Sequence, residues 1–133
     1  MDERIEALAR VAVDTGFHIH TGLGPGFLES VYETVLENRL RAKGIRVARQ
    51  VPVTFSFDGV LFEGGLVADL ILDDVLLIEL KSVGRLSAVH AKQVLTYLRL
   101  MNLPLGLLMN FGAATFKEGI RRIANSDPSS FVS

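Results

Sequence analysis

Two neighbouring apolar segments constrain the fold of this chain more than any other feature of its sequence. Residues 65–72 and 75–81 are rich in Leu, Val and Ile and are separated by a pair of aspartates. Such runs, bounded by turn-forming residues, are typical of β-strands. Because alternate residues of a strand share a face, Asp69 stands alone among apolar neighbours on its face of the first strand. On the second strand, Glu79 and Lys81 interrupt an otherwise apolar face.

The length of the turn between these two strands decides whether their carboxylates meet. A three-residue turn pairs Asp69 with Glu79, and paired residues project to the same side of a sheet. A two-residue turn would instead pair Asp69 with Ile78 and send the carboxylates to opposite faces. Adjacent carboxylates repel unless a cation or a shared proton lies between them, so the first register predicts a metal site. The alternative is a solvated polar strip on an antiparallel sheet.

The remaining segments predict helices and strands that complete an α/β fold. Helical spacing of apolar residues and strand-like runs define these elements, with Ser87 as a helix cap and Gly44 as a helix stop. We predict helices over residues 3–20, from the glycine-rich loop 21–26 to Gly44, and over 88–101 and 115–123, and further strands over 47–57 and 105–111. The order α-α-β-β-β-α-β-α predicts a mixed central sheet flanked by helices.

The size of the chain favours a single domain. Its 133 residues can bury one sizeable core and are too few for two ordinary ones. We predict one domain over residues 1–124 and a flexible C-terminal tail over residues 125–133, which are rich in serine. No apolar run is long enough for a membrane span, and the first ten residues are too charged for a secretory signal. We therefore expect a cytoplasmic protein without a membrane partner.

Composition restricts the possible chemistry and suggests self-association. The chain has no cysteine, which excludes disulfides and thiolate zinc sites and leaves oxygen or imidazole as metal ligands. Such ligands favour hard cations, Mg²⁺ or Mn²⁺. The net charge of −1 gives no overall attraction to polyanions. Hydrophobic residues make up 49% of the chain and the mean hydropathy is positive, so we expect surplus apolar surface to be buried in a homodimer.

The helix predicted after these strands carries two further polar residues of interest. Gln93 and Tyr97 are four positions apart and therefore share one helix face, from which both could reach the strands. The alternative assigns Tyr97 to the core and Gln93 to the surface. Glu29 lies in the first turn of the second predicted helix, after the glycine-rich loop.

These residues together resemble a known pattern. Asp69, then Glu79-x-Lys81, then Gln93-x-x-x-Tyr97 resembles the PD-(D/E)XK nucleases, in particular the Gln-x-x-x-Tyr motif of RecB-like exonucleases. Over roughly residues 10–123 the chain is also similar to the small bacterial GxxExxxR proteins. The segments that carry this second resemblance are 24–32, 78–81, 93–98, 110–111 and 119–122.

The resemblance implies a restriction-endonuclease-like α-β-β-β-α-β core and a metal-dependent nuclease. In that family, the positions of Glu29, Asp69, Glu79 and the Leu80 carbonyl hold the cation, Mg²⁺ or Mn²⁺. The position of Lys81 orients or helps to deprotonate the attacking water. Gln93 and Tyr97 are expected to position the substrate strand, and the implied substrate is nucleic acid, DNA ahead of RNA. The alternative function is a catalytically inactive binding or assembly module with the same fold.

Two positions depart from the family pattern, and one basic run is ambiguous. Ala68 stands where the superfamily name has proline, and Glu33 stands where the GxxExxxR label has arginine, which leaves open what Glu33 faces. Five basic residues between Arg39 and Arg49 could follow phosphates in a nuclease. The ordinary interpretation of such a run is a solvated helix end, where cations suit the helix dipole.

Overall fold

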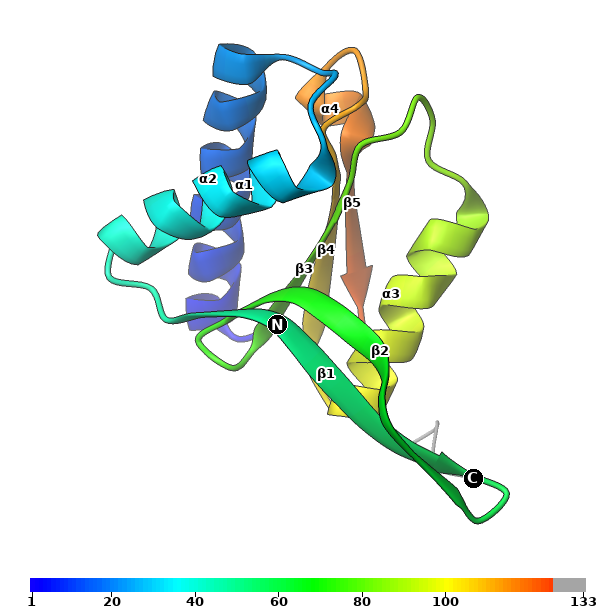
Figure 1. Cartoon of the computed structure of the whole chain (residues 1–133). Helices are drawn as coiled ribbons and strands as arrows, with labels where there is room; N and C mark the ends of the chain where they lie inside the picture. Colours follow the sequence, from blue (N-terminus) through cyan, green and yellow to red (C-terminus); the bar gives the residue numbers. More distant parts are fainter. Residues whose placement is uncertain (126–133) are drawn as a thin grey trace.

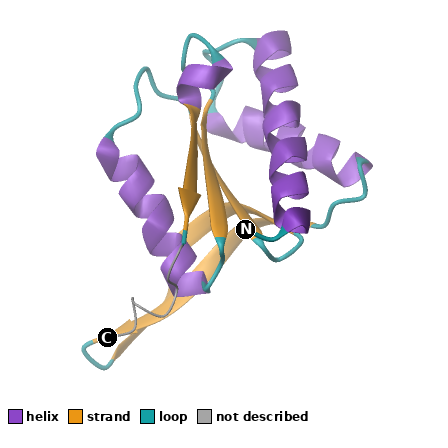
Figure 2. Ribbon diagram, turned by 180° about the vertical axis from the view of Figure 1, so that it is seen from behind, coloured by secondary structure: helices purple, strands orange, loops and turns teal. Residues whose placement is uncertain are grey.

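The fold consists of one twisted sheet between two helical layers. A computed structural model describes residues 1–125 of the chain. The elements are α1 (Glu3–Leu23), α2 (Glu29–Ala42), β1 (Val47–Phe57), β2 (Val60–Leu72), β3 (Leu76–Lys81), α3 (Ala88–Met101), β4 (Leu105–Asn110), α4 (Phe116–Gly119) and β5 (Ile120–Ala124). Figures 1 and 2 show α1 and α2 on one side of the sheet and α3 on the other.

The sheet is mixed, as the sequence predicted. Its five strands lie in the order β1-β2-β3-β4-β5. The first three strands form an antiparallel meander. Helix α3 is the crossover that makes β4 parallel to β3, and β5 returns antiparallel to β4. The mixed α/β architecture expected from the sequence is therefore confirmed.

Strand alternation divides the buried side chains into two cores. One core packs α1 and α2 against alternate residues of β2, β3 and β4, among them Leu70, Ile78 and Leu107. The other packs α3 against the opposite face, where Ile71 and Leu77 contribute. The central strands are buried on both faces, which explains why their sequences read as nearly continuous apolar runs.

The helix predicted over residues 115–123 is wrong beyond its first turn. Helix α4 ends at Gly119, and the chain continues as strand β5, paired from Leu105↔Ala124 to Met109↔Ile120. All six residues of β4 are buried, and a buried edge strand would leave its backbone N–H and C=O groups without partners. Pairing with β5 satisfies them. Ile120 and Ile123 are three apart, a spacing that suits one helix face and therefore misled the sequence-based prediction.

The β1–β2 hairpin is longer than predicted and projects from the body of the molecule (Figure 1). Strand β2 begins at Val60, five residues before the predicted start at residue 65. Phe55 and Phe62 stack across the hairpin with ring centroids 5.1 Å apart. Phe57 at the tip is 68% exposed.

Asn125, the last residue that the structure describes, is held to the body of the protein by hydrogen bonds. The predicted tail began at residue 125, but the Asn125 side chain is buried and donates hydrogen bonds to the carbonyl oxygens of Leu98 and Leu103. The rest of that predicted tail, residues 126–133, lies outside the described residues. Within residues 1–125, no helix combines the length and apolar character that crossing a membrane requires.

Candidate active site

The turn between β2 and β3 has the odd length that the metal-site interpretation requires. Leu70 pairs with Ile78 and Leu72 with Leu76, which leaves residues 73–75 as the turn. Asp73 and Asp74 adopt left-handed backbone conformations, with φ of 47° and 58°. Aspartate tolerates this region because its short side chain can hydrogen-bond locally. Continuing the register by one residue brings Asp69 opposite Glu79.

At Asp69 the backbone ladder between β2 and β3 is replaced by bonds from side chains. The backbone N–H of Asp69 donates to Glu79 Oε1 over 2.9 Å, and the backbone N–H of Leu80 donates to Asp69 Oδ2 over 2.8 Å. Each carboxylate is thus held by the backbone of the other strand. We call this pair of residues the carboxylate fork. The fork fixes two acidic side chains beside each other at the point where β3 continues to Lys81 alongside β4.

Glu79 occupies the most demanding environment of the fork. Glu79 is only 5% exposed to solvent. Burial, and after it the charge of the neighbouring Asp69 carboxylate, raise its pKa to about 8, against smaller opposing effects from the Asp69 backbone N–H and the Lys81 ammonium. Near neutral pH, Glu79 therefore retains a proton unless a cation replaces it.

Helix α3 brings Tyr97 to the same two carboxylates. Tyr97 is 5% exposed and belongs to the core beneath α3. Burial raises its pKa, and the charges of Glu79 and Asp69 raise it further, which places the phenol within electrostatic reach of the fork. Gln93, one turn earlier on α3, is exposed. The structure therefore agrees with the alternative that assigns Tyr97 to the core and Gln93 to the surface, and the charges of the fork act on Tyr97 within that core.

A pocket opens beside the fork, towards α2. It has a volume of about 430 Å³, and its lining includes Asp69 and Leu80 from the strands and Glu29 from the first turn of α2. Ser30, Glu33, Arg49 and Gln50 complete the lining. Hydrogen bonds thus bring Asp69, Glu79 and Leu80 together, the charges of the fork act on Tyr97, and Glu29 lies on the wall of the pocket beside Asp69.

Four residues that line this pocket, Ser30, Glu33, Arg49 and Gln50, were not predicted as site residues from the sequence. Glu33 is buried and accepts hydrogen bonds from Arg49 Nε over 2.9 Å and from Gln50 Nε2 over 2.7 Å. Gln50 Nε2 also lies 3.3 Å from Asp69 Oδ1, so its amide links the two carboxylates. The backbone of Gln50 is left-handed, with φ of 52°, although it lies within strand β1. Backbone strain of this kind collects at functional sites.

The question of what Glu33 faces is thereby answered. Burial raises the pKa of Glu33, the hydrogen bond from Gln50 lowers it, and the Asp69 charge raises it again. Glu33 follows Glu29 by one helical turn, so a shared helix face was a signal available in the sequence. Gln50 carried no such signal, because its place opposite Asp69 depends on the β1–β2 register, in which Arg49 pairs with Leu70.

Comparison with known proteins assigns the family. A model of the PD-(D/E)XK nuclease superfamily matches residues 6–123. The chain belongs to that superfamily. No curated protein and no solved structure matches the chain. The five-stranded mixed sheet flanked by helices is consistent with the restriction-endonuclease-like fold of PD-(D/E)XK nucleases.

PD-(D/E)XK nucleases generally use divalent metals, and the donors of this pocket suit a hard cation. Asp69, Glu79, Glu29 and the Leu80 carbonyl offer oxygen ligands alone, which Mg²⁺ and Mn²⁺ prefer. A carboxylate has about four lone-pair sites, so the fork carboxylates keep acceptor capacity beyond the hydrogen bonds that hold them. Within residues 1–125, however, no three acidic or histidine side chains stand close enough to form a ready-made metal site. The donors are of the oxygen type that a hard cation needs, and the fork holds two of them side by side.

Proposed function

We propose that this domain, residues 1–124, is a metal-dependent nuclease that hydrolyses phosphodiester bonds, with DNA ahead of RNA as substrate. The observation that carries this proposal is the carboxylate fork, which holds Asp69 and Glu79 together beside a pocket lined by Glu29 and Leu80. Two buried or half-buried carboxylates in contact are unfavourable unless a cation or a proton lies between them. A binding site for a cation explains an arrangement that stability alone disfavours.

We assign roles to the residues around the fork as follows. Asp69, Glu79, Glu29 and the Leu80 carbonyl would hold Mg²⁺ or Mn²⁺, which supplies a more acidic water and neutralises charge on the scissile phosphate. Lys81, close enough to act on the Glu79 charge, would orient the attacking water and help to remove its proton.

The α3 helix would hold the substrate strand against this centre. Tyr97, whose pKa the charges of Glu79 and Asp69 raise, would support the carboxylate of Glu79. Gln93 is exposed one turn away and would contact the nucleic-acid backbone. Both residues form the Gln-x-x-x-Tyr pattern of RecB-like exonucleases, which supports this part of the proposal.

We further propose that the chain is one of the GxxExxxR proteins. The loop and first turn of α2 carry the glycine and glutamate of that label, with Gly26 before the helix and Glu29 within it. Glu33 occupies the arginine position, and the guanidinium of Arg49 lies against it from β1. Beside α2 a cationic group is therefore present, but strand β1 supplies it through Arg49, in place of an arginine on α2 itself.

A binding or assembly module without catalysis is the second candidate function. It is favoured by the net charge of −1 and by the absence, within residues 1–125, of three acidic or histidine side chains grouped closely enough to hold a metal ion. Such a protein would keep the fold and the residual site. It would bind nucleic acid or protein without turnover.

A cleavage assay separates the two functions. We expect the parent protein to cut a mixture of DNA and RNA substrates in Mg²⁺ or Mn²⁺ and the Lys81→Ala variant to lose about 100-fold or more of that rate, the usual range for a general acid or base. The matched control is Lys117→Ala, an exposed lysine of the short helix α4 that does not line the pocket beside the fork. Metal-dependent binding without cleavage in the parent would support the module instead.

A further inference from the structure

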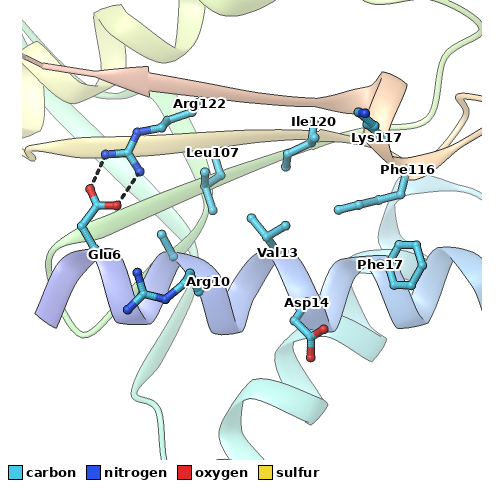
Figure 3. A pocket seen from close by; sticks show the side chains of 11 residues that line it. Glu6, Arg10, Val13, Asp14, Phe17, Leu107, Phe116, Lys117, Ile120 and Arg122 are labelled. Carbon is cyan, nitrogen blue, oxygen red and sulfur yellow. Dashed lines mark hydrogen bonds and ion pairs between the residues drawn. The ribbon is translucent and has the colours of Figure 1, made fainter. Parts of the chain in front are cut away.

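A second concave surface lies away from the carboxylate fork, along helix α1 (Figure 3). This groove has a volume of about 490 Å³ and runs between α1 and the segment β4–α4–β5. It shares no lining residue with the pocket of Glu29 and Asp69. Its apolar lining comes from both walls: Ala9, Val13, Phe17, Leu107, Phe116 and Ile120.

The rim of the groove carries charges of both signs. Figure 3 shows Glu6 paired with Arg122 at one end, Phe17 near Phe116 at the other, and Arg10 and Asp14 on α1 between them. Phe17 is 50% exposed, although it is one of the largest apolar side chains on α1. An apolar floor between alternating charges suits a protein helix and does not suit a polyanion, which the acidic side chains would repel.

The charged stripe of α1, in which Glu6 is half-buried and Arg10, Asp14 and His18 are exposed, is complementary to itself. Glu6, Arg10, Asp14 and His18 recur every four residues, so they form one ridge of the helix. When two copies of α1 lie antiparallel about a two-fold axis at the level of residue 12, Arg10 of each copy meets Asp14 of the other. In the same register, Glu6 meets the imidazole of His18, which can donate a hydrogen bond.

Neighbouring registers lack this complementarity. An axis at the level of residue 10 sets Arg10 against Arg10, and an axis at residue 14 sets Asp14 against Asp14. Like charges in contact across an interface are unfavourable, so the charge pattern selects the axis at residue 12.

We infer that a second copy of this chain covers the groove, with its α1 antiparallel to the first. In this arrangement Phe17 of each copy lies level with Ala7 of the other and extends over the apolar groove. The two contacts are identical, as a two-fold interface requires. The β5 edge of the sheet is a poorer site for self-pairing, because antiparallel pairing about Arg122 opposes two guanidinium groups.

A charge-exchange experiment tests this interface in the full chain. Dimerisation of the parent and variants is measured by analytical ultracentrifugation from low micromolar to 100 µM protein. Because each pair occurs twice, we expect Arg10→Asp and Asp14→Arg each to raise the dimer dissociation constant by about tenfold or more, the order of a few exposed charge pairs. The double variant Arg10→Asp/Asp14→Arg should return to within about threefold of the parent, since the exchanged pair is again attractive.

The apolar contact has a matched control on the hairpin. Phe17→Ser should raise the dissociation constant by about 100-fold, typical of an aromatic residue at the centre of an interface. Phe57→Ser removes a phenylalanine that is even more exposed, at the hairpin tip, and should leave the dissociation constant unchanged. A monomeric parent at 100 µM, a double variant that fails to recover, or a dimer lost through Phe57→Ser would each overturn the inference. None of these outcomes affects the nuclease proposal, which rests on separate residues.

Discussion

The two ends of the β2–β3 pair differ in what holds them together. At the turn end, Leu70, Leu72, Leu76 and Ile78 are all fully buried and pair through an ordinary backbone register. One residue further along, at Asp69 and Glu79, side-chain carboxylates take over the bonding. The difference shows how a fold holds an unfavourable group in place. The packed apolar residues at the turn end position the two carboxylates of the fork, which do not themselves stabilise the fold.

The apolar end is also what keeps Glu79 buried. Its neighbours in sequence, Ile78 and Leu80, are 0% and 1% exposed and are packed under α1 and α2. Glu79 alternates with these residues and so projects to the other face, the side on which Leu77 packs in the core that contains Tyr97. The carboxylate cannot turn out to solvent without pulling the side chains of Ile78 and Leu80 from the core. We therefore expect the fork to show its strain in stability measurements.

The largest expected effect is on the pH dependence of stability, and it distinguishes the fork from the turn end of the β2–β3 pair. Unfolded Glu79 loses its proton near its ordinary pKa of 4.5, whereas folded Glu79 keeps it to about 8. The folded state therefore binds more protons in this window, and stability falls as pH rises, by about 1.4 kcal/mol per pH unit at most. We expect Glu79→Gln to remove this slope and to be more stable than the parent at pH 8.

Urea unfolding between pH 4.5 and 9 measures this effect. Glu3→Gln, an exposed glutamate in the first turn of α1, is the control and should keep the parent's slope. Parallel curves for the parent and Glu79→Gln would show that Glu79 is not protonated in the folded protein. The fork would then carry no pH-dependent cost in stability that sets it apart from the turn end of the β2–β3 pair.

The next effect in size is stabilisation by a divalent cation, which should act at the fork alone. A ligand that binds only the folded state at about a hundredfold excess over its Kd adds roughly 2.7 kcal/mol to the unfolding free energy. We expect Mg²⁺ or Mn²⁺ to raise the melting temperature accordingly, and more strongly as pH rises, because the cation displaces a proton. Asp69→Asn should lose most of this rise.

Asp58→Asn is the control for the cation titration. Asp58 lies at the tip of the β1–β2 hairpin with φ of 51°, a conformation that asparagine also tolerates. This variant should respond to Mg²⁺ and Mn²⁺ as the parent does. An Asp69→Asn protein that shifts equally, or a parent that does not shift over a millimolar titration, would contradict a metal centre at the fork.

The smallest effect concerns the support that β1 gives to the fork. Gln50→Ala removes the amide that links Glu33 and Asp69 and leaves a buried carboxylate short of one donor. We expect a loss of about 1 kcal/mol in unfolding free energy by urea titration. Gln93→Ala, an exposed glutamine on α3, should change stability by less than about 0.5 kcal/mol. Equal losses in both variants would remove Gln50 from the supporting network.

Local pattern in the sequence predicted much of this protein. The alternation of apolar residues around Asp69 and Glu79 identified both acids, and it named the turn length on which their meeting depends. The helices α1, α2 and α3 and the central strands lie close to their predicted positions, because each has a strong local period. Glu29 lies in the first turn of α2, as predicted. These features depend on residues that are near one another in the chain.

Tertiary structure decided the rest, because the deciding contacts join distant residues. The odd-length turn, with Asp73 and Asp74 in a left-handed conformation, accompanies the burial of both Leu72 and Leu76 in the core, which no local propensity specifies. Residues 120–124 became a strand because buried β4 needed a partner, against a spacing that suits a helix. Gln50 joined the site through a β1–β2 register that spans 19 residues between its amide and Asp69. Periodicity determines which face a residue prefers, but only packing determines what it meets there.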